Sequence, residues 1–139
     1  MAMKWCAIAI CCLAVPAFAD APFAATSPIE RITIRKGAVK SEDPNISCSR
    51  LRIDEKRVRY FLRHAKPSIQ YNYAQGYEIG SCSASAAVRF KGGRQVELTI
   101  DSGTGWGTAE NKRSIAYLYC EECTDLLDPD FDFKEPAAP

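Results

Sequence analysis

Two cysteines near the end of the chain have a spacing that several kinds of chemical site share. The stretch "YLYCEEC", Tyr117 to Cys123, runs from an aromatic-rich segment into a Cys-x-x-Cys pair. Such a pair can exchange disulfides in a thiol oxidoreductase, supply half of a zinc site, or form a structural disulfide. The compartment of the protein and the elements around Cys120 and Cys123 decide between these chemistries.

The N-terminus predicts export. Residues 1–19 form a signal peptide in which the apolar run Trp5 to Val15 is followed by Ala17-Phe18-Ala19, the small-x-small pattern that signal peptidase cleaves. That run has 11 residues, whereas a helix needs roughly 20 to span a bilayer. We therefore expect cleavage after Ala19, a periplasmic location and no lasting membrane anchor.

Export favours disulfides over metal binding. Of the seven cysteines, three leave with the signal peptide, and Cys48, Cys82, Cys120 and Cys123 remain. An even number of cysteines in an oxidising compartment indicates two disulfides. A zinc site is not expected, because only one pair has the short spacing of zinc ligands and disulfide formation competes for the thiols. No other cofactor is predicted.

The surroundings of the Cys-x-x-Cys pair do not favour redox catalysis. A thioredoxin-like pair begins a helix, where the positive potential stabilises the thiolate. Here Glu121 and Glu122 stand between the cysteines and Asp125 follows them, and nearby negative charge raises a thiol pKa. No βαβ pattern surrounds the pair, so a thiol oxidoreductase that uses Cys120 and Cys123 remains only our third hypothesis.

Other enzyme classes have no better support in the sequence. His64 is the only histidine, and no serine lies in a Gly-x-Ser-x-Gly elbow. The stretch "GTGWG" lacks the strand, helix and lysine of a phosphate-binding loop. We predict no catalytic residue and expect the protein not to be an enzyme.

Hydrophobic alternation predicts an antiparallel sheet of about four to six strands. Alternation of period two, which is typical of half-buried strands, occurs in several segments. These segments are residues 30–39, 47–53, 68–77, 82–90, 94–101 and 114–120. The glycine-rich residues 102–113 are expected to be a connection.

The residues around Gly92 and Gly93 predict a hairpin with an odd number of loop residues. A two-residue loop would place core residues opposite solvent-facing ones, whereas opposed residues share a face. An odd loop, such as Gly92-Gly93-Arg94, instead sets Phe90 opposite Val96 and Val88 opposite Leu98.

One amphipathic helix is predicted in "DEKRVRYFLRHAKP", residues 54–67. Asp54 is a suitable N-cap, and Pro67 ends the helix near Ala65. An apolar stripe follows the i, i+3, i+4, i+7 pattern of a core-facing helix. The stripe consists of Val58, Phe61, Leu62 and Ala65. The sequence thus predicts an α+β domain over residues 30–125, after a flexible lead-in at 20–29 and before an acidic tail at 126–139.

Charge is unevenly distributed in the mature chain. Residues 20–119 hold 16 basic and 10 acidic side chains, whereas residues 120–139 hold 1 basic and 7 acidic ones. The basic and acidic totals cancel, which together with export argues against a nucleic-acid partner. The tail is expected to be solvated, to dock on its own basic helix, or to contact a partner.

Protein binding is the remaining functional class. Trp106, in a polar loop, is either an exposed interface anchor or a residue that folds back over the sheet. A basic stripe on the helix is either a solvated face or a contact surface for an acidic partner or the protein's own tail. It consists of Lys56, Arg59, Arg63 and Lys66. The candidate contacts are Trp106, Lys56, Arg59, Arg63, Lys66, Asp128, Asp130, Phe131, Asp132 and Phe133.

Residues 48 to 123 resemble a family of small exported proteobacterial proteins that are mostly described as hypothetical. The resemblance lies in "DEKRVRYFLRHA", "GSCSASAAVRFKGGRQVELTI", "GTG" and "YLYCEEC", which contain a Ser-Cys-x-Ala and a Tyr-x-Tyr-Cys-x-x-Cys motif. It implies no catalytic residue. In size and export the chain is similar to periplasmic immunity proteins that neutralise secreted toxins, which is an analogy of kind.

The expected sheet order predicts which cysteines pair. In a simple meander, the strand from Cys82 and the strand that ends at Cys120 run parallel, so these cysteines lie at opposite ends, over ~20 Å apart. The Cα limit for a disulfide is ~7 Å. We therefore predict the pairs Cys48 with Cys82 and Cys120 with Cys123.

The leading hypothesis is a non-enzymatic periplasmic protein-binding domain, most concretely an immunity-type inhibitor of a secreted toxin. A structural or envelope-associated module is the alternative. The sequence names neither the partner nor the oligomeric state.

Overall fold

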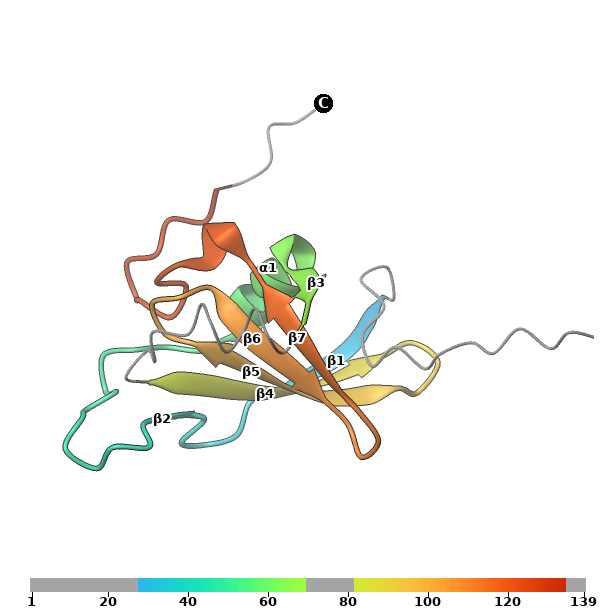
Figure 1. The fold of residues 1–139 in the computed structure, drawn as a ribbon, viewed down its shortest axis with the longest axis horizontal. Coiled ribbons are helices and arrows are strands. Elements are labelled where there is room, and N and C mark those ends of the chain that lie inside the picture. The colour runs from blue at the N-terminus through green and yellow to red at the C-terminus, as the bar shows by residue number, and fades with distance from the viewer. Residues whose placement is uncertain (1–27, 70–81, 135–139) are drawn as a thin grey trace, which may run out of the picture.

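A computed structural model describes residues 28–69 and 82–134 and has the predicted α+β architecture. One helix packs on a face of an antiparallel sheet (Figure 1). The signal peptide, most of the lead-in, most of the predicted strand at 68–77 and the last five residues lie outside the described residues.

The sheet has seven strands, all paired antiparallel, with the spatial order β1-β4-β5-β6-β7-β3 and with β2 also paired to β4. The strands are β1 (Ile29–Thr33), β2 (Val39–Lys40), β3 (Lys66–Ser68), β4 (Ser83–Phe90), β5 (Gln95–Asp101), β6 (Trp106–Glu110) and β7 (Ile115–Tyr119). A bulge interrupts β1 between Ile29 and Arg31, and Pro67 is the middle residue of the short β3. By the strand order, β1 and β3 form the two edges of the sheet among the described residues.

Helix α1 spans Glu55–His64 and begins and ends as its sequence predicts. The Asp54 side chain accepts a hydrogen bond from the Arg57 N–H at 2.8 Å, which caps the first turn. At the other end, the Ala65 N–H donates to the Phe61 carbonyl at 2.8 Å. The predicted apolar stripe faces the sheet, and Val58 and Phe61 are fully buried.

The β4–β5 hairpin has the predicted faces but not the predicted register. Val88 lies opposite Val96, and the Phe90 N–H donates to the Arg94 carbonyl at 2.8 Å. The loop therefore has three residues, an odd number, but they are Lys91-Gly92-Gly93, and the expected pairing of Phe90 with Val96 is wrong by two residues. Gly92 and Gly93 both have positive φ, at 98° and 90°, which places the turn on the glycines.

The segment 102–113, expected to be only a connection, contains strand β6. Its alternation is short and is interrupted by Gly107, so the strand has almost no apolar periodicity to detect. Gly107 faces α1, and a Cβ there would lie 2.7 Å from both the Phe61 Cζ and the Thr99 carbonyl oxygen. The missing side chain therefore lets the helix approach the sheet closely.

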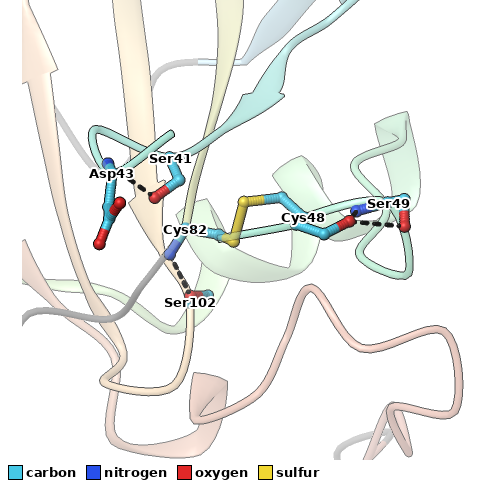
Figure 2. Close-up of a disulfide and its surroundings, with 7 residues drawn as sticks. Ser41, Asp43, Cys48, Ser49, Cys82 and Ser102 are labelled. Carbon is cyan, nitrogen blue, oxygen red and sulfur yellow. Dashed lines mark hydrogen bonds between the residues drawn. A yellow bond between two sulfur atoms is a disulfide. The ribbon is translucent and has the colours of Figure 1, made fainter. Parts of the chain in front are cut away.

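Both predicted disulfides are present, Cys48 with Cys82 (Figure 2) and Cys120 with Cys123. The expected strand directions were wrong, however, because β6 reverses the chain once more and β4 and β7 run antiparallel. Cys82 and Cys120 thus lie at the same end of the sheet. Strands β5 and β6 separate them, and three spacings of ~4.8 Å still exceed the ~7 Å Cα limit.

The predicted strand at residues 47–53 does not form. The disulfide to Cys82 holds this segment at Cys48. Further along, the Arg52 N–H donates to the Leu127 carbonyl at 2.8 Å. These bonds tie it to the cysteine before β4 and to the C-terminal segment, and its backbone does not join the sheet.

The close approach at Gly107 predicts a steric cost for a side chain. In Gly107→Ala, the new methyl group forces Phe61 or the β5 backbone to move, and we expect the free energy of unfolding to fall by roughly 1–3 kcal/mol. Urea denaturation measures the change. Thr108→Ala, next in β6 on the opposite face, is the control and should cost less than about 1 kcal/mol. Equal losses in the two variants would contradict the packing described here.

Candidate functional site

The C-terminal segment folds back on α1. Leu126 and Leu127 are buried in the core, although residue 126 was expected to begin an acidic tail. Residues 128–134 then run along the helix, with Phe131 and Phe133 packed against the core. Of the three expected behaviours of the tail, docking on its own helix is the one observed for residues 126–134. We call the outer side of α1 together with residues 131–134 the α1–tail surface.

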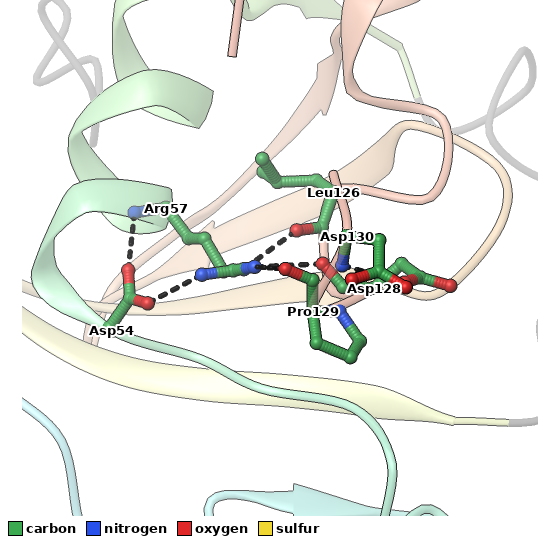
Figure 3. A network of polar contacts seen from close by, with 6 residues as sticks. All are labelled: Asp54, Arg57, Leu126, Asp128, Pro129 and Asp130. Carbon is green, nitrogen blue, oxygen red and sulfur yellow. Dashed lines mark hydrogen bonds and ion pairs between the residues drawn. The ribbon is translucent and has the colours of Figure 1, made fainter. Parts of the chain in front are cut away.

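Arg57 fixes the path of the tail (Figure 3). Its guanidinium donates to the Leu126 carbonyl at 2.9 Å and to the Asp128 carbonyl at 2.7 Å, and it forms an ion pair with Asp54 at 2.5 Å. The residue is only 6% exposed. Because the fork of donors satisfies backbone oxygens that the helix itself cannot reach, one buried charge joins the helix N-terminus to the tail.

An aromatic cluster follows the Arg57 network along the helix. The Tyr60 ring lies edge-on to the rings of Phe131 and Phe133, with both centroid distances 5.4 Å. The Lys56 ammonium lies 4.1 Å from the Phe133 ring centroid, in cation–π geometry. The alternation of the tail therefore places its phenylalanines on the helix, while the alternating Asp130 and Asp132 remain exposed.

A cavity of about 350 Å³ opens beside Phe133 on the α1–tail surface. Its lining residues are Glu55, Lys56, Arg59, Tyr60, Arg63, Phe133 and Lys134. Arg59 is paired with Glu55 at 2.7 Å. Arg63 is exposed, and its guanidinium makes no ion pair with any residue that the structure describes. The cavity thus combines an aromatic wall with an excess of positive charge.

Tyr60 is the polar residue buried deepest in this wall. It is 6% exposed, and its hydroxyl hydrogen has no acceptor among the described residues. Burial raises the pKa of Tyr60 above its ordinary value of 10.0, with smaller contributions from the carboxylates of Glu122 and Asp132. The backbone N–H of Lys134 lowers the pKa of Tyr60, because it donates a hydrogen bond to the phenol oxygen. An N–H cannot accept the phenol hydrogen in return. The phenol hydrogen therefore lacks an acceptor.

The Cys-x-x-Cys pair lies under the other end of the helix. Cys120 and Cys123 are bonded and fully buried; Cys120 precedes the 3-10 turn Glu121–Cys123, and Cys123 is its last residue. Glu122 in this turn lies 3.4 Å from the His64 ring, whose Nδ1 contacts the Tyr60 carbonyl at 2.9 Å. Disulfide exchange requires an accessible sulfur, so this geometry is that of a structural bond at the end of β7.

Most of the predicted contact residues meet on one surface. Lys56, Arg59, Arg63 and Phe133 line the cavity, and Phe131 stands behind it. Lys66 lies beyond the helix in β3 and does not reach the cavity. Asp128 accepts a hydrogen bond from the Asp130 N–H at 2.9 Å, which shapes the bend before the aromatic residues.

Trp106 lies elsewhere and is not an exposed anchor. It is 8% exposed and stands beside Tyr119, with ring centroids 4.7 Å apart. Since Gly107 faces α1 and successive side chains alternate, Trp106 lies on the opposite face of the sheet. The alternative, that this residue folds back on its own sheet, agrees with the structure.

Two important residues were missed from the sequence, Arg57 and Tyr60. Both flank the apolar stripe of α1, and Arg57 stands three residues after its partner Asp54. The spacing alone gives a weak local ion-pair signal. Their burial depends on the tail, whose position the sequence did not determine.

The described part of the chain has neither a membrane-spanning helix nor a cluster of metal-binding side chains. No helix within residues 28–69 and 82–134 is long and apolar enough to cross a membrane. The same residues contain no group of three or more His, Cys, Asp or Glu side chains that could hold a metal ion. A wider groove, of about 770 Å³, lies between residues 34–41 and 46–54.

No protein-family model, curated protein or solved structure matches the chain.

The Arg57 network predicts a large cost for removing one guanidinium. In Arg57→Ala, the tail carbonyls and Asp54 lose a buried charged partner, and we expect the free energy of unfolding to fall by about 2–4 kcal/mol. Hydrogen exchange at residues 126–130 should accelerate more than exchange in β5. The matched control, Arg59→Ala, breaks an exposed pair and should cost no more than about 1 kcal/mol. Similar losses in both variants would show that the buried Arg57 network contributes no more to stability than an exposed ion pair.

Tyr60 predicts a loss of stability in alkali. The unfolded phenol ionises near its ordinary pKa of 10.0, whereas the folded one keeps its proton to higher pH. Deprotonation thus favours the unfolded chain, so stability is complete below that value and falls as pH rises through the folded pKa. Urea denaturation at about pH 8 and about pH 10.5 should show a smaller alkaline loss in Tyr60→Phe than in the wild type. Tyr119→Phe, at an exposed position, should follow the wild type, and an unchanged loss in Tyr60→Phe would contradict this assignment.

Proposed function

We propose that this protein is a non-enzymatic binding domain of the bacterial periplasm that recognises a protein partner through the α1–tail surface. Its most concrete form is an immunity-type inhibitor that covers the active site of a secreted toxin. The single observation that carries the proposal is the cavity beside Phe133, in which basic side chains surround an aromatic wall on a fixed helix. Aromatic and arginine side chains are the residues that most often dominate binding energy at protein interfaces.

The surface is held in place before any partner arrives. The Arg57 bonds and the Tyr60 ring contacts fix the tail against α1, and α1 itself packs on the sheet through Val58 and Phe61. A preorganised surface loses less conformational entropy on binding than a mobile one. This rigidity supports a binding role.

Export and the absence of catalysis are parts of the same proposal. Two disulfides fit an oxidising compartment, and the N-terminal sequence provides the expected signal peptide. The resemblance to small exported proteobacterial proteins supports the periplasmic assignment. The thiol oxidoreductase hypothesis has less support, because both sulfurs of the Cys-x-x-Cys pair are buried.

A structural or envelope-associated module is the competing function. In that case the aromatic cluster exists only to hold the tail, and the exposed cations of α1 are a solvated face. The two functions differ in one measurable respect, because only a binding domain has a partner that is localised at Arg63.

Site-specific crosslinking tests the proposal. A photoreactive residue in place of Arg63 should capture one secreted protein from the native cell envelope, and the purified chain should then block the activity of that protein at a one-to-one ratio. The same substitution at Arg113, in the turn between β6 and β7, is the control and should capture nothing in common. Capture at Arg63 without inhibition keeps the binding domain and overturns the immunity role. No specific capture at Arg63 supports the structural module, and equal capture at both positions contradicts a defined surface.

A further inference from the structure

We infer that the cavity beside Phe133 binds a carboxylate of an acidic, aromatic segment of the partner protein. The inference rests on the proposed function and adds the chemistry of the recognised segment. Arg63 and Lys134 supply the charge, Tyr60 supplies a hydrogen-bond donor, and Phe133 supplies the apolar wall.

The charge in the cavity is not used up within the described chain. Glu55, the one carboxylate of the lining, is paired with Arg59. The Lys56 ammonium lies over the Phe133 ring. Arg63 has no ion pair within the described ranges, and with Lys134 it leaves positive charge at the mouth of the cavity. A carboxylate placed between these side chains would neutralise it.

The Tyr60 hydroxyl is a second, independent indication of a ligand. A buried donor without an acceptor costs free energy, and such groups in native structures often mark a functional constraint. The hydroxyl belongs to a residue in the cavity wall but is covered in the described structure. A carboxylate oxygen in the cavity therefore accepts the phenol hydrogen only after the groups that cover the hydroxyl move aside.

The tail shows what kind of segment this helix accommodates. Asp130-Phe131-Asp132-Phe133 alternates acid with phenylalanine, and its rings pack on Tyr60 while Lys56 covers Phe133. A partner segment of the same composition could continue this arrangement into the cavity, with its ring on Phe133 and its acid on Arg63. Apolar and anionic chemistry are thus required together.

Peptide titration of the oxidised mature chain, followed by amide NMR shifts, tests this inference. The probe is acetyl-Asp-Phe-Asp-Phe-amide, and the matched probe is its Asn-Phe-Asn-Phe analogue. We expect the acidic peptide to shift amides of α1 and residues 131–134 and to bind more weakly as salt is raised. The neutral analogue should bind at least about fivefold more weakly. Inorganic phosphate, a third probe, should not reproduce the shifts, because it lacks the ring.

Three variants separate the contributions. Arg63→Gln should weaken acidic-peptide binding about three- to fivefold, whereas Lys66→Gln, which removes a cation outside the cavity, should leave it unchanged. Tyr60→Phe should weaken binding about tenfold while the folded state is kept or stabilised, since the variant removes an unsatisfied buried group. A purely structural tyrosine would change stability and not peptide affinity.

Each result bears on the inference separately from the proposed function. Equal affinity for both peptides, shifts away from α1, or equal effects of Arg63→Gln and Lys66→Gln would overturn it, as would phosphate binding with the same shifts. If Arg63 crosslinks a toxin that acidic peptide does not displace, the proposed function stands and this inference fails. If the acidic peptide binds as expected and no toxin is inhibited, carboxylate binding in the cavity is supported and the immunity role fails.

Discussion

The guanidinium of Arg57 is the interaction on which the rest of this structure depends. It is a buried charge, and burial of an unpaired charge is strongly unfavourable. Asp54 is a local partner three residues away, whereas the Leu126 and Asp128 carbonyls reach the guanidinium only when the chain after Leu126 returns to the helix. The core leucines, the aromatic cluster and the cavity beside Phe133 all follow from this return.

The elements that local patterns determine were predictable from the sequence. The α1 boundaries follow from Asp54 and Pro67, and β4 and β5 follow from their alternation. Strand β6 was missed because close packing required Gly107, and a glycine interrupts the apolar pattern at the position where the contact is tightest. The disulfide pairs were predicted correctly although the strand directions were wrong. Cys82 and Cys120 are too far apart to bond whether the chain between them forms three strands, as expected, or four, as observed.

The candidate site was predictable only in part. The basic positions follow from helical periodicity, so Lys56, Arg59, Arg63 and Lys66 were expected to share a face. The first three do, whereas Lys66 lies beyond the helix in β3. The aromatic wall was not predictable, because it is made by a segment more than 60 residues away along the chain (sequence separations of 69 and 71 for the Arg57 bonds). For Trp106, the glycines on both sides were compatible with an exposed ring, whereas strand β6 places the ring against its own sheet, beside Tyr119.

The edges of the sheet limit how this protein can associate with others. Many domains recruit partners by adding a strand to an open sheet edge, which requires a run of free backbone donors and acceptors. Here β1 contains a bulge, and β3 has three residues with Pro67, which carries no N–H, in the middle. Within residues 28–69 and 82–134, neither edge offers a regular hydrogen-bonding ladder. Strand addition at these edges is therefore unfavourable, and the same feature protects the disulfide-bonded sheet from joining its neighbours edge to edge.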